Sequence, residues 1–203
     1  MNRRRVRTVS IISAGLLAAS MFGGVAGAED PPAAATGTVS CRLVGRMTFT
    51  TPLAAGGTAA TTANFKGLAV GCTGTDGGAV VKRGVITASV DLAANDCAAL
   101  VTPGAITLAG SVRWKTVAAA APIADTTVSL GGFTADPASL LKPLYAGTGS
   151  ASAGSFSGQS IASTLSVSQS IAAITNQCAG ARLRGFTVRA SLSTIAIGTP
   201  APV

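Results

Sequence analysis

Strict alternation of apolar and polar residues is the feature that most constrains the fold of this chain. Between Val39 and Phe49 the odd positions carry apolar residues or glycine, and the even positions are mostly polar. The same period of two recurs in residues 84–92 and 106–115. Successive side chains of a β-strand point to opposite faces of the sheet, so this pattern predicts strands with one buried and one solvated face.

Further strands are predicted from similar runs rich in valine, threonine and serine. They are expected at residues 64–72, 125–131, 153–159, 161–169 and 184–197, the last with a bulge before Ile195. Glycine or proline separates most of these runs, and short strands with such turns are typical of antiparallel sandwiches and barrels. We therefore expect an all-β fold, either an antiparallel sandwich or a closed barrel of about seven to nine strands.

One stretch follows a helical period instead. Ile171, Ile174 and Cys178 are spaced as residues on one face of a helix. A serine directly before the stretch can cap its start, and a glycine after it can end it. We expect one short helix near residues 171–178, with Cys178 on its inner face.

The first 28 residues have the composition of a secretory signal peptide. Four arginines precede an apolar run from Val9 to Val25, and Ala26-Gly27-Ala28 supplies a cleavage site of the A-x-A type. A retained membrane anchor is the alternative, although the run is short for a spanning helix. We expect cleavage after Ala28 and a secreted protein, located in the extracellular space or the cell envelope.

The rest of the chain is expected to form one domain. Residues 29–37 are predicted to be a flexible leader, residues 38–198 a single β domain and residues 199–203 a C-terminal tail. Outside residues 1–28 the chain keeps 11 of its 15 basic side chains against 7 acidic ones. The basic residues are scattered with few aromatics between them, so we expect no nucleic-acid partner, and no membrane contact after signal cleavage.

The four cysteines predict two disulfides in an exported protein, and three pairings are possible. If Gly56-Gly57 is the centre of a hairpin, Cys41 lies directly opposite Cys72. Opposed positions on neighbouring strands bring two Cβ atoms within disulfide reach. Cys97 then pairs with Cys178.

This register has one flaw. It places Lys66 beside Met47 and turns the aromatic ring of Phe65 outward. A bulge near Gly67 would return Phe65 to the buried face.

The glycine-rich stretch VGCTGTDGG, residues 70–78, resembles a ligand-binding loop only in its glycines. A phosphate loop needs a lysine and a hydroxyl at fixed spacing before a helix, whereas this stretch leads into a predicted strand. A calcium loop needs several oxygen ligands, and Asp76 stands alone. We expect Cys72 to end a strand and Asp76-Gly77 to make a turn.

No catalytic, metal or cofactor site is predicted. The chain has no histidine, which removes the commonest general base and metal ligand. Five aspartates remain in the predicted domain, at positions 76, 91, 96, 125 and 136, and each is explained by a turn or a strand end. Two alternatives are a weak calcium site at Asp91, Asn95 and Asp96, and a dyad of serine and lysine.

A binding surface needs only exposed side chains. The apolar stretch of residues 140–147, read as a loop, contains the one tyrosine of the chain, so Leu144 and Tyr145 are candidate binding residues. The connection of residues 117–125 is a second candidate contact loop. Trp114 follows the parity of the buried residues on its strand, so we expect it in the core.

These motifs in their order give the chain a resemblance. A first strand CRLVGRMTF, a second strand ending in GCTG, Cys97 to Leu100, the strand LAGSVRWK and a late cysteine resemble small exported actinobacterial proteins of no established activity. The resemblance covers about residues 38–198 and implies no site residues. Composition is also similar to exported enediyne-binding apoproteins and subtilisin inhibitors, but cysteine spacing and length match neither.

These observations together predict a non-catalytic secreted β domain with a binding or structural role and an unidentified extracellular or cell-envelope partner. Two alternatives are an extracellular hydrolase that uses aspartate, serine and lysine, and a small-ligand-binding or protease-inhibitor-like protein. Two of the aspartates brought together in one concave site would favour the hydrolase.

Overall fold

The computed structural model describes residues 37–100, 107–118, 120–135, 143–180 and 182–198. The strands in these residues are β1 (Thr38–Leu53), β2 (Thr61–Asp76), β3 (Ala79–Leu92), β4 (Leu108–Thr116), β5 (Thr126–Ala135), β6 (Leu144–Ala153), β7 (Ser160–Ser166), β8 (Leu183–Val188) and β9 (Thr194–Ile197). A 3-10 helix, η1 (Cys97–Leu100), follows β3, and an α-helix, α1 (Ile171–Ala179), follows β7. The predicted all-β class with one short α-helix is confirmed.

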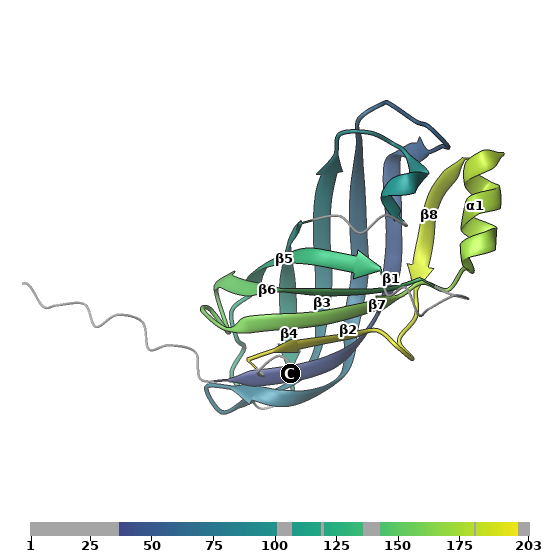
Figure 1. Cartoon of the computed structure of the whole chain (residues 1–203). Coiled ribbons are helices and arrows are strands. Elements are labelled where there is room, and N and C mark those ends of the chain that lie inside the picture. The colour runs from purple at the N-terminus through teal and green to yellow at the C-terminus, as the bar shows by residue number, and fades with distance from the viewer. Residues whose placement is uncertain (1–36, 101–106, 119, 136–142, 181, 199–203) are drawn as a thin grey trace, which may run out of the picture. The chain divides into compact units, whose positions relative to one another are not determined.

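Eight of the nine described strands close into an antiparallel barrel. Each strand pairs with the next from β1 to β7, β7 pairs with β9, and β9 pairs with the first part of β1. The extra strand, β8, pairs with the later part of β1. Of the two predicted architectures the barrel is therefore the one that forms. Figure 1 shows β1, β2 and β3 side by side, with β5, β6 and β7 crossing them steeply.

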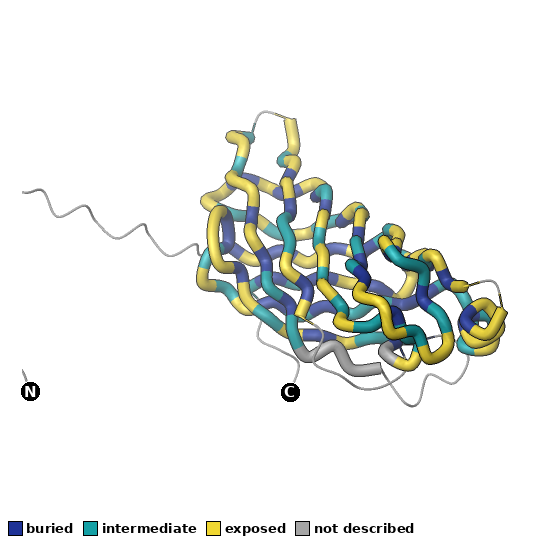
Figure 2. Tube along the Cα trace, turned by 90° about the horizontal axis from the view of Figure 1, so that it is seen from above, coloured by how far each residue is buried: buried dark blue, intermediate teal, exposed yellow. Residues whose placement is uncertain are grey.

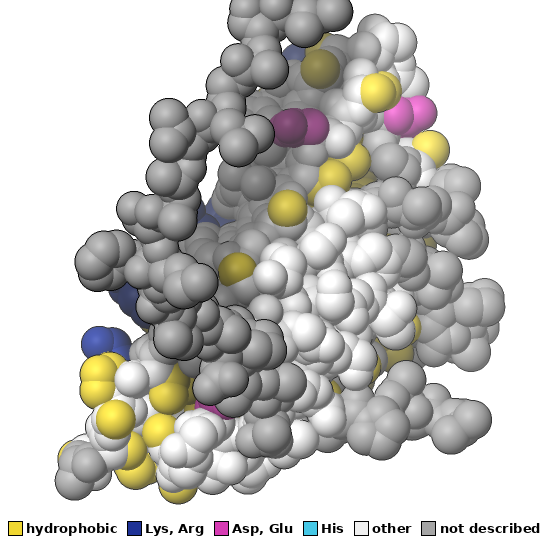
Figure 3. Space-filling model, turned by 90° about the vertical axis from the view of Figure 1, so that its left-hand side faces the viewer, with side chains coloured by type: hydrophobic (Ala, Val, Ile, Leu, Met, Phe, Trp, Pro, Cys, Tyr) yellow, Lys and Arg dark blue, Asp and Glu magenta, His cyan; other side chains and the backbone are white. Residues whose placement is uncertain are grey.

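Buried and exposed residues alternate along the strands, as Figure 2 shows. In β1 the predicted inward side chains of Val39, Leu43, Met47 and Phe49 are at most 8% exposed. The inward side chains of all the strands join in one hydrophobic core. Trp114 is 5% exposed, so its predicted place in the core is confirmed. The face in Figure 3 shows mainly uncharged polar side chains and backbone among the described residues.

The pairing of β1 with β2 follows the predicted register only at one end. From Arg42 onward each β1 residue pairs one position earlier on β2, so that Met47 lies opposite Phe65. The extra residue on β2 is accommodated at Gly71, whose φ of 58° suits a β-bulge. The bulge predicted near Gly67 is therefore wrong in position, although the burial of Phe65 that it was meant to explain is confirmed.

Both predicted disulfides are confirmed. Cys41 on β1 bonds to Cys72 on β2, and Cys97 at the start of η1 bonds to Cys178 on α1. No free cysteine remains in the chain. Two disulfides are typical of proteins from oxidising compartments outside the cytoplasm.

Helix α1 begins and ends as predicted. The side chain of Ser170 accepts a hydrogen bond from the backbone of Ala173, and Gly180 follows the last turn. Its buried residues are Ile174 and Cys178, so the predicted inner face is confirmed.

The turn in VGCTGTDGG is also confirmed, with a shift of position. Strand β2 continues past Cys72 to Asp76, which pairs with Ala79 on β3. Gly77 and Gly78, with φ of 54° and 82°, make the turn between the two strands. Positive φ at both central residues is the requirement of a tight two-residue hairpin, which glycine meets without strain.

Three predictions of strand position are wrong. Residues 154–159, expected as strand, form the turn between β6 and β7, and residues 144–147, expected as loop, belong to β6. The predicted strand at 184–197 is interrupted over residues 189–193 rather than bulged, which separates β8 from β9. All three stretches mix small, polar and apolar residues, so their local preferences distinguish strand from turn poorly.

The predicted signal peptide, most of the predicted leader and the tail at residues 199–203 lie outside the described residues. Within the described residues, no helix combines the length and the apolar character needed to cross a membrane.

Candidate functional site

One end of the barrel is filled by aromatic side chains. Phe156, in the turn between β6 and β7, is fully buried, and its ring centroid lies 5.5 Å from that of Trp114. The indole Nε1 of Trp114 donates a 2.8 Å hydrogen bond to the hydroxyl of Thr126. That hydroxyl in turn donates a 2.6 Å bond to the carbonyl of Ser155. Aromatic burial and satisfied polar groups therefore close this end.

The other end contains a cavity of about 60 Å³. It is lined by Met47 and Phe49 of β1, Ala63 of β2, Val90 and Leu92 of β3, Leu100 of η1, Leu108 of β4, Tyr145 of β6, Leu165 of β7 and Phe186 of β8. We call this space the mouth cavity. Apart from the hydroxyl of Tyr145 its side chains are apolar, so it favours an apolar ligand or part of one.

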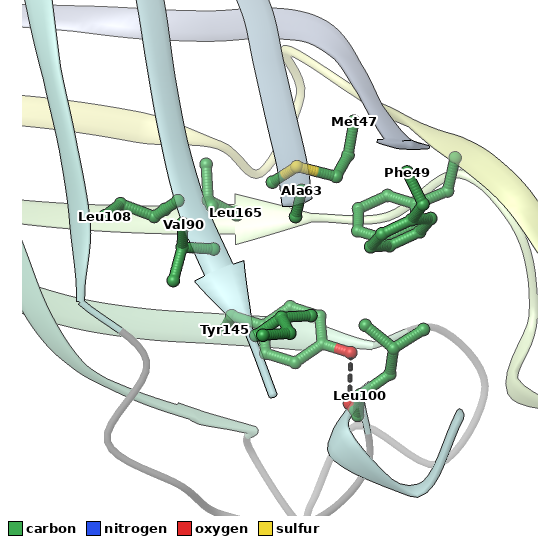
Figure 4. A pocket seen from close by; sticks show the side chains of 10 residues that line it. Met47, Phe49, Ala63, Val90, Leu100, Leu108, Tyr145 and Leu165 are labelled. Atoms are coloured by element: carbon green, nitrogen blue, oxygen red, sulfur yellow. Dashed lines mark hydrogen bonds between the residues drawn. The ribbon is translucent and has the colours of Figure 1, made fainter. Parts of the chain in front are cut away.

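Strand alternation positions the walls of the mouth cavity. Met47 pairs with Phe186 across β1 and β8, and Phe49 pairs with Ala63 across β1 and β2. The rings of Phe49 and Phe186 pack against each other with centroids 6.0 Å apart. Figure 4 shows Met47, Ala63 and Phe49 on one side of this space and the ring of Tyr145 on the other.

Tyr145 supplies the polar group of the mouth cavity. Its hydroxyl donates a hydrogen bond to the backbone carbonyl of Leu100, drawn as a dashed line in Figure 4. Burial raises the pKa of Tyr145 to about 12, because the anionic form loses hydration. The group is therefore neutral at physiological pH and acts as a hydrogen-bond donor.

A second void of about 30 Å³ lies in the barrel interior. It shares Leu108 and Leu165 with the lining of the mouth cavity, so these two side chains stand between the two spaces. Ser163 also lines this void, and its hydroxyl donates a 3.0 Å bond to the carbonyl of Thr194. A ligand that displaces Leu108 or Leu165 would gain access to the inner void.

Helix η1 covers the mouth cavity because its flanks are fixed. The disulfide of Cys97 and Cys178 ties it to α1. The preceding Asn95 donates a 2.8 Å bond from its side chain to the carbonyl of Pro52 and accepts a 2.9 Å bond from the backbone of Ala59. The segment that carries Leu100 is therefore attached both to the loop between β1 and β2 and to the helix.

Only one of the two predicted binding residues lines the mouth cavity. Tyr145 lines the mouth cavity, whereas its neighbour Leu144 is half buried and does not line it. Sequence reasoning missed the other cavity residues, among them Met47, Phe49 and Phe186. Their signal was their inward parity near strand ends, but parity alone does not show which end of a barrel stays unfilled.

Two of the described carboxylates accept hydrogen bonds from different parts of the chain. Asp91 accepts a 2.7 Å bond from the hydroxyl of Thr62, and Asp96 accepts bonds from the backbone of Gly56 and Ala98. The described residues contain no group of three side chains able to hold a metal ion. Asp136 lies outside the described residues.

The comparisons with known proteins assign no family to this chain. No family model, no curated protein and no solved structure matches the chain. The resemblance to exported actinobacterial proteins therefore stays a prediction, and functional inference must rest on the barrel itself.

Proposed function

We propose that this chain is a non-catalytic binding protein that acts outside the cytoplasm and takes up a small apolar molecule in the mouth cavity. The observation that carries the proposal is the asymmetry of the barrel ends. Phe156 and Trp114 fill one end, whereas the other keeps a cavity of about 60 Å³ with apolar walls. Barrels of eight strands are wide enough to hold one small ligand.

The walls define the chemistry of the ligand. The rings of Phe49, Phe186 and Tyr145 and the thioether of Met47 suit an aromatic ring or a short alkyl chain. A hydroxyl or carbonyl group on the ligand would meet the Tyr145 hydroxyl and the Leu100 carbonyl, which now satisfy each other. The volume of about 60 Å³ holds a few methylene groups, and a cavity that binds benzene has about 150 Å³, so an aromatic ring would need side-chain movement.

Two features support the proposed location outside the cytoplasm. The signal-peptide composition of the N-terminus predicts secretion, and the two disulfides are stable in the compartments that secretion reaches. We propose that the partner of the protein there is such a small molecule, with no part for nucleic acid or metal.

The test is direct binding of small probes to the purified protein. We expect benzene, p-cresol and short n-alkanols to give measurable heat in titration calorimetry and to raise the melting temperature in a concentration-dependent way. p-Cresol should bind more tightly than toluene, because only p-cresol can hydrogen bond to the pair of Tyr145 and Leu100.

A matched pair of variants locates the probe. Ala63→Leu adds three carbons to the cavity wall, where Ala63 is 3% exposed, and should weaken probe binding about tenfold or more. Ala109→Leu makes the same change on the exposed face of β4 and should leave binding unchanged. Absence of binding by every probe, or equal binding by both variants, would refute the proposal.

A further inference from the structure

The outer face of β1 to β4 carries a group of aliphatic side chains. Val44 pairs with Leu68 across β1 and β2, and Leu68 pairs with Val85 across β2 and β3. Val70 lies two positions along β2, on the same face as Leu68. Leu68 is 40% exposed and the three valines are half buried. These four side chains point away from the barrel core, and their neighbours on the same face are basic.

Six exposed cations surround the aliphatic group: Arg42, Arg46, Lys66, Arg83, Arg113 and Lys115. We call the four aliphatic residues and these six cations the outer patch. Arg46 pairs with Lys66 on one side of the group, and Arg83 pairs with Lys115 on the other. Arg113 pairs with Val85 and so continues the aliphatic row.

Direct opposition of like charges on neighbouring strands destabilises a sheet. The outer patch contains two such pairs, Arg46 with Lys66 and Arg83 with Lys115. The described carboxylates lie outside these pairs: Asp76 at the end of β2, Asp91 near the end of β3 and bonded to Thr62, Asp96 beside Gly56 and Asp125 directly before β5. Among the described residues, no strand pairing places a carboxylate opposite a cation of the outer patch, so the repulsion within these two pairs is not offset there.

We propose that the outer patch is a docking surface for an acidic amphipathic helix of a partner protein. The two cationic rows are four residues apart along the strands, or about 13 Å. That spacing fits a helix with side chains, which is about 10–12 Å wide. The apolar side of the helix covers the aliphatic group, and carboxylates on its two flanks meet the two rows of cations.

The composition of the outer patch favours this occupant over other anions. A bare polyanion would leave Val44, Leu68 and Val85 exposed to water, so it would not use the apolar part of the surface. A bilayer interface is commonly contacted through tryptophan and tyrosine, and the outer patch has neither. Arginine, of which the outer patch has four, is by contrast enriched at the energetically important centre of protein interfaces.

The probe is a labelled designed helix of roughly 18 residues, or five turns, with leucine at i, i+3, i+4 and i+7 and glutamate on both flanks. Its affinity for the purified protein is measured by fluorescence anisotropy at about 0.15 M salt. A peptide with the same glutamates but glutamine in place of leucine, poly-glutamate and vesicles of anionic lipid are the competing probes. We expect the amphipathic helix to bind and the other three to bind at least about tenfold more weakly.

Variants separate docking from folding. Lys66→Glu should weaken the amphipathic helix about tenfold or more, yet raise the melting temperature, because it converts the opposed pair with Arg46 into an attractive one. Leu68→Ser removes apolar contact without changing charge and should also weaken binding. Arg184→Glu makes the same charge reversal beside Leu183, which pairs with the far end of β1 at Leu53, and should leave binding within about twofold.

Three results would overturn the docking proposal. The first is no binding of the amphipathic helix. The second is that the glutamine-substituted peptide, poly-glutamate or the vesicles bind at least as tightly as the amphipathic helix, which would make the outer patch a general polyanion site or a lipid site. The third is an effect of Arg184→Glu as large as that of Lys66→Glu. The mouth cavity takes no part in this experiment, so its outcome is independent of the proposed small-ligand function.

Discussion

Gly71 shows how one residue sets the positions of many others. Its φ of 58° lets β2 hold one extra residue opposite β1, and every pair from Arg42 onward is displaced by one as a result. A Cβ at this position would meet only the flexible end of the Arg42 side chain, so the backbone conformation and not space requires glycine. Without the displacement, Phe65 would face solvent instead of the core.

Tyr145 should make the barrel less stable at alkaline pH. Below pH 10 the phenol is neutral in both states. As pH rises from 10 to 12, the unfolded chain loses the proton while the folded protein, with a pKa of about 12, keeps it. The folded state then binds more protons, so the free energy of unfolding falls with rising pH, by at most about 3 kcal/mol.

The substitution Tyr145→Phe should remove this dependence. We expect the advantage of the wild type in unfolding free energy, measured in urea, to shrink as pH rises above 9 and to reverse in sign as pH approaches 12. At neutral pH the variant should lose about 0.5–1.5 kcal/mol with the bond to the Leu100 carbonyl. Because this is the one tyrosine of the chain, phenolate absorbance reports its titration directly. Parallel pH profiles of the two proteins would contradict the assignment.

At the scale of the element, α1 and η1 are the parts that depend most on a covalent bond. Helix α1 has nine residues, and a helix of that length is marginal in water without tertiary support. Its buried contacts come from Ile174 and Cys178, and its link to η1 is the disulfide with Cys97. The order of η1, and with it the cover of the mouth cavity, therefore depends on that bond.

Replacing Cys97 and Cys178 by serine should loosen these two elements before the sheet. Loop-closure entropy over a separation of 81 residues predicts a loss of about 4–5 kcal/mol, as an upper figure. Hydrogen exchange should speed up in α1 and η1 first, and probes of the mouth cavity should bind more weakly. The serine replacement of Cys41 and Cys72 is the control, since it should raise exchange in β1 and β2 instead. Uniform loss of protection in the first variant would show that α1 is no separate unit.

At the scale of the whole molecule, the barrel closes where β7, β9 and β1 meet. Ser193, which precedes β9, is fully buried there. Its hydroxyl accepts a 2.7 Å bond from the backbone of Ser166, and its carbonyl accepts a 2.8 Å bond from the backbone of Leu43. One residue thus bonds to strands on both sides of the seam.

Ser193→Ala should weaken the closure. It leaves the buried amide of Ser166 without its acceptor, which costs about 1–3 kcal/mol of unfolding free energy. Urea unfolding measures the loss, and hydrogen exchange should place it in β7 and β9. Ser152→Ala, on the exposed face of β6, removes only a 3.5 Å contact and should be neutral within about 0.5 kcal/mol. Equal stabilities of the two variants would show that the hydroxyl of Ser193 has no part in closure.

The sequence by itself determined the local features of this protein. The alternation in residues 39–49 predicts β1 because the side chains of an extended backbone point to opposite faces at a period of two. The helical spacing before Cys178 predicts α1 in the same way. The pairing of Cys41 with Cys72 could be inferred because one hairpin brings them together, and the remaining pair then follows.

Tertiary structure alone decided the rest. Whether the strands form a sandwich or a barrel depends on β9 returning to β1, a contact between residues about 155 positions apart that no local pattern encodes. The bulge at Gly71 replaced the predicted one at Gly67 because both glycines satisfy local sterics, and only the packing of the finished core distinguishes them. The mouth cavity exists because Phe156 fills one end of the barrel and no side chain among the described residues fills the other, and this balance of volumes is a property of the closed fold.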